Sequence, residues 1–159
     1  MLTDIEYFRF EEDFVEKNVR CIPMIVRFKM DAAGIKLKLA EWSKFDVEER
    51  IILAIKSCST EEERKSYKKY LADLVVKYTG KQASEMKVEQ HPVWSDTDTV
   101  PEALNEKAKE FGWQITVEQW RSLRNLQRFA LTKLYKSGHE NKNFPKAIRE
   151  FGLARQTSK

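Results

Sequence analysis

The apolar residues near the start of the chain are spaced as in an amphipathic helix. One stripe recurs every three or four residues: Ile22, Val26, Met30 and Ala33. Pro23 suits the first turn of a helix, where its missing N–H costs nothing, and Gly34 suits the left-handed position that ends one. The pattern therefore predicts a helix between Pro23 and Gly34. The alternation in IKLKL, which follows, predicts a short extended segment.

Capping signals predict the next two helices. Asp46 with Glu49, and Thr60 with Glu63, have the spacing of a capping box. The second of these helices has three glutamates in its first turn and lysines further on, as the helix dipole prefers. Gly80 is expected to end it. Its apolar face is predicted to consist of Tyr67, Leu71, Leu74, Val75 and Tyr78.

Residues 81–99 form the one long stretch that we expect to be irregular. A loop of that length in a compact domain is either functional or ordered by packing its own side chains, and Val93 and Trp94 favour the second alternative. After the loop, a capping signal at Thr99 predicts the start of another helix, which Gly112 is expected to close.

The C-terminal part of the chain predicts two more helices. The first is strongly apolar and contains LQRFALTKLY. The second is short, with Asn143 as its cap, Pro145 in its first turn and Gly152 at its end. Residues 154–159 are expected to be a frayed tail.

An internal similarity links two parts of the chain at a constant offset of 78 positions. Residues 22–53 match residues 100–131 without gaps, and the apolar stripes keep their register. The identical pairs are Pro23 and Pro101, Lys29 and Lys107, Gly34 and Gly112, Trp42 and Trp120, Arg50 and Arg128, and Leu53 and Leu131. This predicts two related helix–Gly–extended–Trp–helix units, 22–57 and 100–135. The alternative is that two unrelated helical segments carry proline, glycine and tryptophan at the same spacing.

Composition agrees with a helical protein. The chain has 159 residues, 42% of them apolar and 34% charged, with only 5 glycines and 4 prolines, so tight turns are few. We expect a single compact all-α domain over 1–159 with about six to seven helices. The net charge is +4 and the pI about 9.0, but lysine and arginine alternate with acids instead of forming a long basic run.

Several classes of function lack their usual sequence patterns. The 2 cysteines are far apart, His139-Glu140 lacks the second histidine of a zinc motif, and no glycine-rich phosphate loop occurs. We therefore expect no catalytic residues, no cofactor and no metal. A carboxylate pair assembled only by folding stays open. The longest apolar run, CIPMIV, is too short for a bilayer, and the acidic N-terminus is unlike a secretory or transit signal. The expected compartment is the cytoplasm.

One segment combines apolar residues with a basic edge. RCIPMIVRFKMDAAGIKLKL contains five basic residues: Arg20, Arg27, Lys29, Lys36 and Lys38. It is either a core helix with charged rims or a basic docking surface for an acidic partner. Cys21, before a helix-starting proline, is either a buried inert thiol or one activated by the helix N-terminus.

Two further features have alternative interpretations. Trp42 and Trp120 lie in apolar stripes and are expected to be core anchors, with base stacking as the alternative. HENKNF, residues 139–144, either caps and joins the last two helices or belongs to a recognition surface.

The chain resembles the nitrate reductase-associated proteins of cyanobacteria over nearly its whole length. The resemblance is carried by FEEDF (10–14), RCIPMIVRFKMDAAGIKLKLAEW (20–42), HPVW (91–94), LQRFALTKL (126–134), HENKNF, and Ala147 with EFGL (150–153). It implies a non-catalytic accessory protein in nitrate assimilation that binds the molybdenum and iron–sulfur nitrate reductase and supports its maturation or activity. No catalytic residues are carried over.

The positions that match the family's motifs are candidates for contact with this partner. They are Arg20, Cys21, Arg27, Lys29, Asp31, Lys36, Lys38, His139, Glu140, Asn141 and Asn143. Two other hypotheses follow from the residues themselves. The first is a basic helical regulator that binds nucleic acid, an interaction that should weaken steeply with salt. The second is a small enzyme or cofactor carrier, which a metal assay and an absorption spectrum would reveal.

Overall fold

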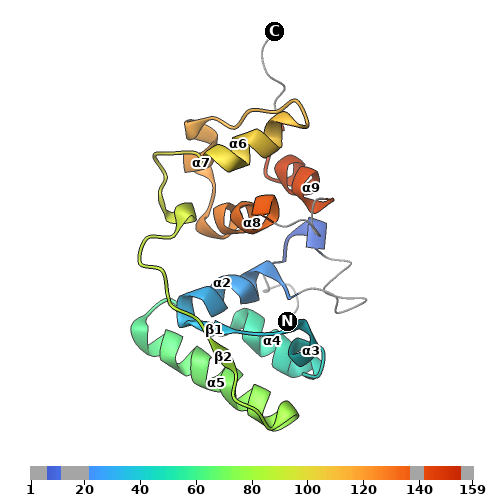
Figure 1. Cartoon of the computed structure of the whole chain (residues 1–159), viewed down its shortest axis with the longest axis vertical. Helices are drawn as coiled ribbons and strands as arrows, with labels where there is room; N and C mark the ends of the chain where they lie inside the picture. Colours follow the sequence, from blue (N-terminus) through green and yellow to red (C-terminus); the bar gives the residue numbers. More distant parts are fainter. Residues whose placement is uncertain (1–6, 12–21, 137–141, 155–159) are drawn as a thin grey trace. The chain divides into compact units, whose positions relative to one another are not determined.

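Helices dominate the computed structural model of the chain, which describes residues 7–11, 22–136 and 142–154 (Figure 1). This confirms the predicted fold class. The residues group into two compact units, 1–89 and 90–159, and each is described by itself. The expectation of one domain over the whole chain stays a prediction.

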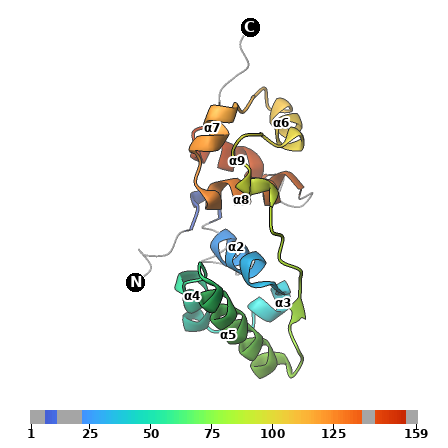
Figure 2. The same ribbon diagram turned by 90° about the vertical axis from the view of Figure 1, so that its left-hand side faces the viewer.

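The first unit consists of short elements around one long helix. In chain order they are η2 (Arg9–Glu11), α2 (Met24–Ala33), β1 (Ile35–Lys36), α3 (Leu39–Trp42), α4 (Val47–Ile55), α5 (Glu61–Thr79) and β2 (Ser84–Glu85). Helix α2 packs against α5 and α4 (Figures 1 and 2). Val26, Leu53, Tyr67, Leu71 and Val75 lie at the centre, with no exposed surface.

Local signals explain why these helices begin where they do. Asp46 and Thr60 cap α4 and α5, and in each capping box the glutamate three residues later reaches back to the cap's backbone N–H, as predicted. The Tyr67 hydroxyl then donates to the carbonyl of Leu53 at 2.7 Å. This bond fastens the middle of α5 to α4 and satisfies a buried phenol.

Gly34 ends α2 in the left-handed conformation, with φ of 79°. A Cβ at this position would lie 3.1 Å from the carbonyl oxygen of Met86 and 3.0 Å from the Val88 side chain. Both the backbone conformation and the close approach therefore require glycine. The next residues pair antiparallel with β2, Ile35 opposite Glu85, so part of the long loop predicted over 81–99 is a strand.

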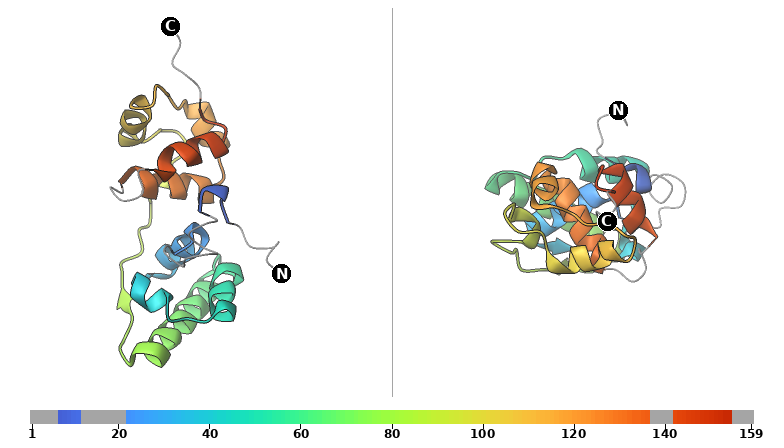
Figure 3. Two further views of the ribbon diagram at one scale, coloured as in Figure 1. Left: turned by 90° about the vertical axis from the view of Figure 1, so that its right-hand side faces the viewer. Right: turned by 90° about the horizontal axis from the view of Figure 1, so that it is seen from above.

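The second unit is built around α8. Its elements are η3 (Val93–Ser95), α6 (Glu102–Lys109), α7 (Val117–Ser122), α8 (Asn125–Lys136) and α9 (Asn143–Glu150). Helix α8 contacts α6, α9 and η3, and Figure 3 shows α8 in orange beside α9 in red. The core side chains Leu104, Trp120, Leu131, Leu134 and Phe144 have no exposed surface.

The 81–99 loop is partly ordered by its own side chains, as expected. The Trp94 ring meets Phe129 edge-on, with 6.5 Å between ring centroids, and the Trp94 carbonyl accepts a 2.8 Å bond from Nε of Arg128. The backbone carbonyl of Asp96 accepts a hydrogen bond from the Trp120 indole N–H at 2.8 Å. Val93, however, is 45% exposed.

Two predicted helix starts differ from the structure, and a third helix start was not predicted. Helix α6 begins at Glu102 behind Pro101, so Thr99 does not cap it. Asn143 is the first residue of α9, behind Lys142, and makes no capping bond. A capping box of Thr116 and Gln119 starts α7 inside a stretch that had been expected to begin as an extended segment.

Hydrogen bonds repeat at the offset of 78 positions that the sequence predicts. The backbone N–H groups of Lys38 and Asp46 donate to Glu41 and Glu49 in the first unit. The equivalent N–H groups of Thr116 and Arg124 donate to Gln119 and Gln127 in the second, all at 2.8–2.9 Å. Arg50 donates to the carbonyl of Phe45, and Arg128 to that of Leu123. Trp42 and Trp120 are both buried, as expected of core anchors.

Candidate interaction surface

Lys29, one of the predicted docking residues, is engaged inside the first unit. Its ammonium donates to the carbonyls of Ala54 at 2.8 Å and Lys56 at 2.7 Å. These carbonyls lie at the C-terminal end of α4, where helix geometry leaves acceptors without intrahelical partners and the dipole favours a cation. Lys29 therefore fastens α2 to the end of α4.

The other described candidates on and after α2 differ in exposure. Arg27 and Asp31 on α2 are half-buried and have further interaction partners, among them the Met24 sulfur, 3.8 Å from Nη1 of Arg27. Lys36 on β1 and Lys38 just before α3 are exposed. Among the described basic candidates, Lys36 and Lys38 are the most accessible to a partner.

Part of the predicted site lies outside the described residues. This applies to Arg20, Cys21, His139, Glu140 and Asn141. Asn143 is described: it is 6% exposed, and its side-chain oxygen has no hydrogen-bond partner among the described residues. Whether HENKNF belongs to a recognition surface therefore stays a prediction.

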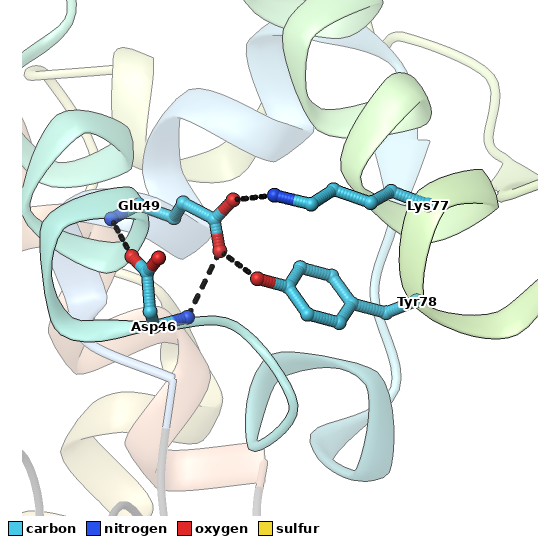
Figure 4. A network of polar contacts seen from close by, with 4 residues as sticks. All are labelled: Asp46, Glu49, Lys77 and Tyr78. Carbon is cyan, nitrogen blue, oxygen red and sulfur yellow. Dashed lines mark hydrogen bonds and ion pairs between the residues drawn. The ribbon is translucent and has the colours of Figure 1, made fainter.

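A buried carboxylate joins the start of α4 to the end of α5 (Figure 4). Glu49 is 8% exposed and accepts from Lys77 at 2.9 Å, from the Tyr78 hydroxyl at 2.6 Å and from the backbone N–H of Asp46 at 2.9 Å. Sequence analysis identified Glu49 as a capping residue and Tyr78 as part of an apolar face. It did not predict their contact across 29 positions.

Electrostatics in this cluster favour the ionised carboxylate. Burial alone would raise the pKa of Glu49, but hydrogen bonds from Tyr78, the Asp46 backbone and Lys77 together lower it below its ordinary 4.5. The hydrogen bond to Glu49 raises the pKa of Tyr78 above 10.0 and that of Lys77 above 10.5. A general acid or base that works near neutral pH needs a pKa shifted towards neutrality, and these shifts run the other way. The cluster therefore holds the start of α4 against the end of α5.

The solvent side of α4 carries an apolar stripe that the sequence analysis had not separated from the core. Val47, Ile51 and Ile55 recur every four residues and form what we call the α4 stripe. Val47 is 61% exposed, Ile55 49%, and Ile51 is half-buried, while the neighbouring Ile52 is 38% exposed. A surface helix normally has polar residues on this side. The signal was present in the sequence, because α4 has more apolar residues than one helix face can bury.

The described residues offer no pattern typical of a metal site. No three His, Cys, Asp or Glu side chains come together among them. The thiol of Cys58 is buried, and burial raises its pKa. Within the described part of the chain, no helix is both long and apolar enough to cross a membrane.

The fold and these surfaces define a class: a helical protein whose described residues form two compact units, with exposed lysines and an apolar stripe on the first unit. The chain belongs to the family of conserved nitrate reductase-associated proteins, whose family model matches residues 7–151. The resemblance noted in the sequence is thereby confirmed. Searches among curated proteins and among solved structures gave no match.

Proposed function

We propose that this protein binds nitrate reductase as a non-catalytic accessory protein and supports the maturation or activity of that enzyme. The observation that carries the proposal is the family match over residues 7–151, because the family is described by its association with nitrate reductase. Two features of the site support it. The Glu49 cluster has pKa shifts unsuited to proton transfer near neutral pH, and the first unit presents charged and apolar side chains to solvent.

The accessory role has two forms that binding can distinguish. A maturation factor would hold the apo-enzyme while its molybdenum and iron–sulfur groups are inserted, and would release the finished enzyme. An activity modulator would bind the finished enzyme and stabilise its active state. The affinity for each form of the reductase therefore separates the two roles.

The first experiment is capture of purified nitrate reductase by the immobilised full chain. We expect recovery of the enzyme, and we expect the double variant Lys36→Glu with Lys38→Glu to lose most of it, because both side chains are exposed. Reversing Lys29 would be uninformative, since that change also removes the bonds to the end of α4.

A matched control makes the same charge change elsewhere on the first unit. Lys65 and Lys69 are exposed on α5, where each forms a surface ion pair of small energetic weight. Lys65→Glu with Lys69→Glu should leave the recovery unchanged. If the unaltered chain recovers neither apo- nor finished enzyme at low salt, the proposed function is wrong.

A further inference from the structure

The predicted repeat at an offset of 78 positions allows equivalent helix positions to be compared in the two units. In the second unit, the η3 segment lies on α8 and is held by two neighbouring residues. Arg128 donates from Nε to the carbonyl of Trp94 at 2.8 Å, and Phe129 meets the Trp94 ring edge-on. Arg128 also donates to the carbonyl of Leu123, which places its guanidinium.

In the first unit the residues at the equivalent positions are Arg50 and Ile51 of α4. Arg50 repeats the placing bond, donating from Nη1 to the carbonyl of Phe45 at 2.9 Å. Among the described residues, no backbone carbonyl accepts from Nε of Arg50, the counterpart of the donor that holds Trp94. Beside it, Val47 and Ile55 stand 61% and 49% exposed, one turn before and after Ile51. The pair that holds η3 is thus repeated as Arg50 and Ile51, while the residues of α8 equivalent to Val47 and Ile55 are Asn125 and Lys133. In the described part of the first unit, no counterpart of η3 bonds to this pair.

We propose that the α4 stripe together with Arg50 is a docking site for a short apolar segment with an aromatic side chain, supplied by nitrate reductase. The aromatic ring packs against Val47, Ile51 and Ile55, and a backbone carbonyl next to it accepts a hydrogen bond from Nε of Arg50. This inference rests on the proposed function, since it names the surface that the reductase would occupy.

The chemistry of the occupant follows from η3 and from the sequence at the same offset. Residues 13–16, DFVE, stand 78 positions before HPVW, and Glu16 occupies the position of Trp94. A carboxylate has no apolar surface to pack against Ile51 as the Trp94 ring packs against Phe129. The sequence therefore has no aromatic residue at the position equivalent to Trp94, which favours a segment supplied by the partner.

The size of the site favours a short segment over a second copy of the chain. Helix α4 has 9 residues, which at about 1.5 Å per residue makes it about 13 Å long. A stable protein dimer buries roughly 800 Å² on each partner, far more than three side chains on such a helix provide. One turn or short strand with a single aromatic anchor matches this site.

The test measures the affinity of the full chain for purified nitrate reductase. Val47→Asp puts a negative charge at the N-terminal end of α4, and Ile55→Lys puts a positive charge at its C-terminal end. The helix dipole favours both charges, so the helix should remain folded. We expect each variant to bind at least about tenfold more weakly, since a hot-spot contact is worth that much. Arg50→Lys removes Nε and should weaken binding about three- to tenfold.

Val76→Lys is the matched control, because Val76 is 44% exposed on α5. It should bind as the unaltered chain does. Circular dichroism of each variant verifies the fold. Equal affinities for the unaltered chain and both stripe variants would overturn this inference and leave the proposed function standing. Absence of binding by the unaltered chain would overturn both.

A photo-crosslinking residue at position 55 identifies the occupant directly. The expected product joins the chain to a segment of the reductase that contains an aromatic residue. A product within the same chain, at residues 13–16, or between two copies of the chain would show that another segment occupies the stripe, and would overturn the inference.

Discussion

Replacing Lys29 with alanine should destabilise the protein, although the side chain belongs to a segment with the pattern of a docking surface. The ammonium makes two bonds to carbonyls at the end of α4, at 2.8 Å and 2.7 Å, and Lys29 is half-buried. A hydrogen bond to a charged group contributes about 1.5–3 kcal/mol. In the variant, water can hydrogen-bond to part of the exposed carbonyls, so we expect the free energy of unfolding to fall by about 2–4 kcal/mol. Against a typical unfolding free energy of about 5–15 kcal/mol, that is a large fraction.

Urea unfolding followed by far-ultraviolet circular dichroism measures this loss. Lys29→Met, which keeps most of the apolar stem, should lose nearly as much as the alanine variant, because the missing bonds and not the missing volume dominate. Lys36→Ala is the control, and its exposed position predicts a change below about 0.5 kcal/mol. If Lys29→Ala unfolds as the unaltered chain does but no longer binds nitrate reductase, the structural role is refuted and Lys29 is a docking residue.

Three further predictions concern buried polar groups. Glu49→Gln should lower the free energy of unfolding by about 1–2 kcal/mol at pH 7. Because the folded-state pKa of Glu49 is lowered, the stabilisation by its carboxylate is present above the ordinary pKa of 4.5 and is lost as pH falls through the folded-state pKa. The unfolding free energies of the variant and the unaltered chain should therefore converge at acid pH. Arg128→Met should lower the free energy of unfolding in urea by about 3 kcal/mol or more, because Arg128 donates to the carbonyls of Trp94 and Leu123. Arg50→Met breaks only the bond to the carbonyl of Phe45 and should lower it by about 1 kcal/mol. Iodoacetamide should modify Cys58 slowly in the folded protein and faster in urea, because burial raises its pKa; equal rates, followed by peptide mass spectrometry, would contradict this.

Helix positions followed from the sequence where the signal was local. The boxes at Asp46 and Thr60, the stop at Gly34 and the buried face around Tyr67 depend on residues within one or two turns, so spacing alone predicts them. Thr99 failed because Pro101 supplies the start of α6, and both residues were compatible with the pattern.

The candidate site was harder to predict because it depends on contacts between distant residues. Lys29 bonds to carbonyls 25 and 27 positions away, and a basic residue on a helix edge has the same pattern whether its partner is such a carbonyl or another protein. The pairing of Glu49 with Lys77 spans 28 positions. Solvent exposure of Ile55 likewise depends on which elements cover α4. Only three-dimensional placement separates these alternatives.

The two units differ in what the residues at equivalent positions bind. Glu49 and Gln127 both cap their own helices, but only the carboxylate of Glu49 also binds a long helix, through Lys77 and Tyr78. Helix α8, in contrast, has η3 bound at Arg128 and Phe129, the positions equivalent to Arg50 and Ile51. Covering that face of α8 stabilises the second unit, while leaving Val47 and Ile55 exposed gives the first unit no folding benefit. The exposed apolar stripe therefore agrees with the docking site that we propose for a protein partner.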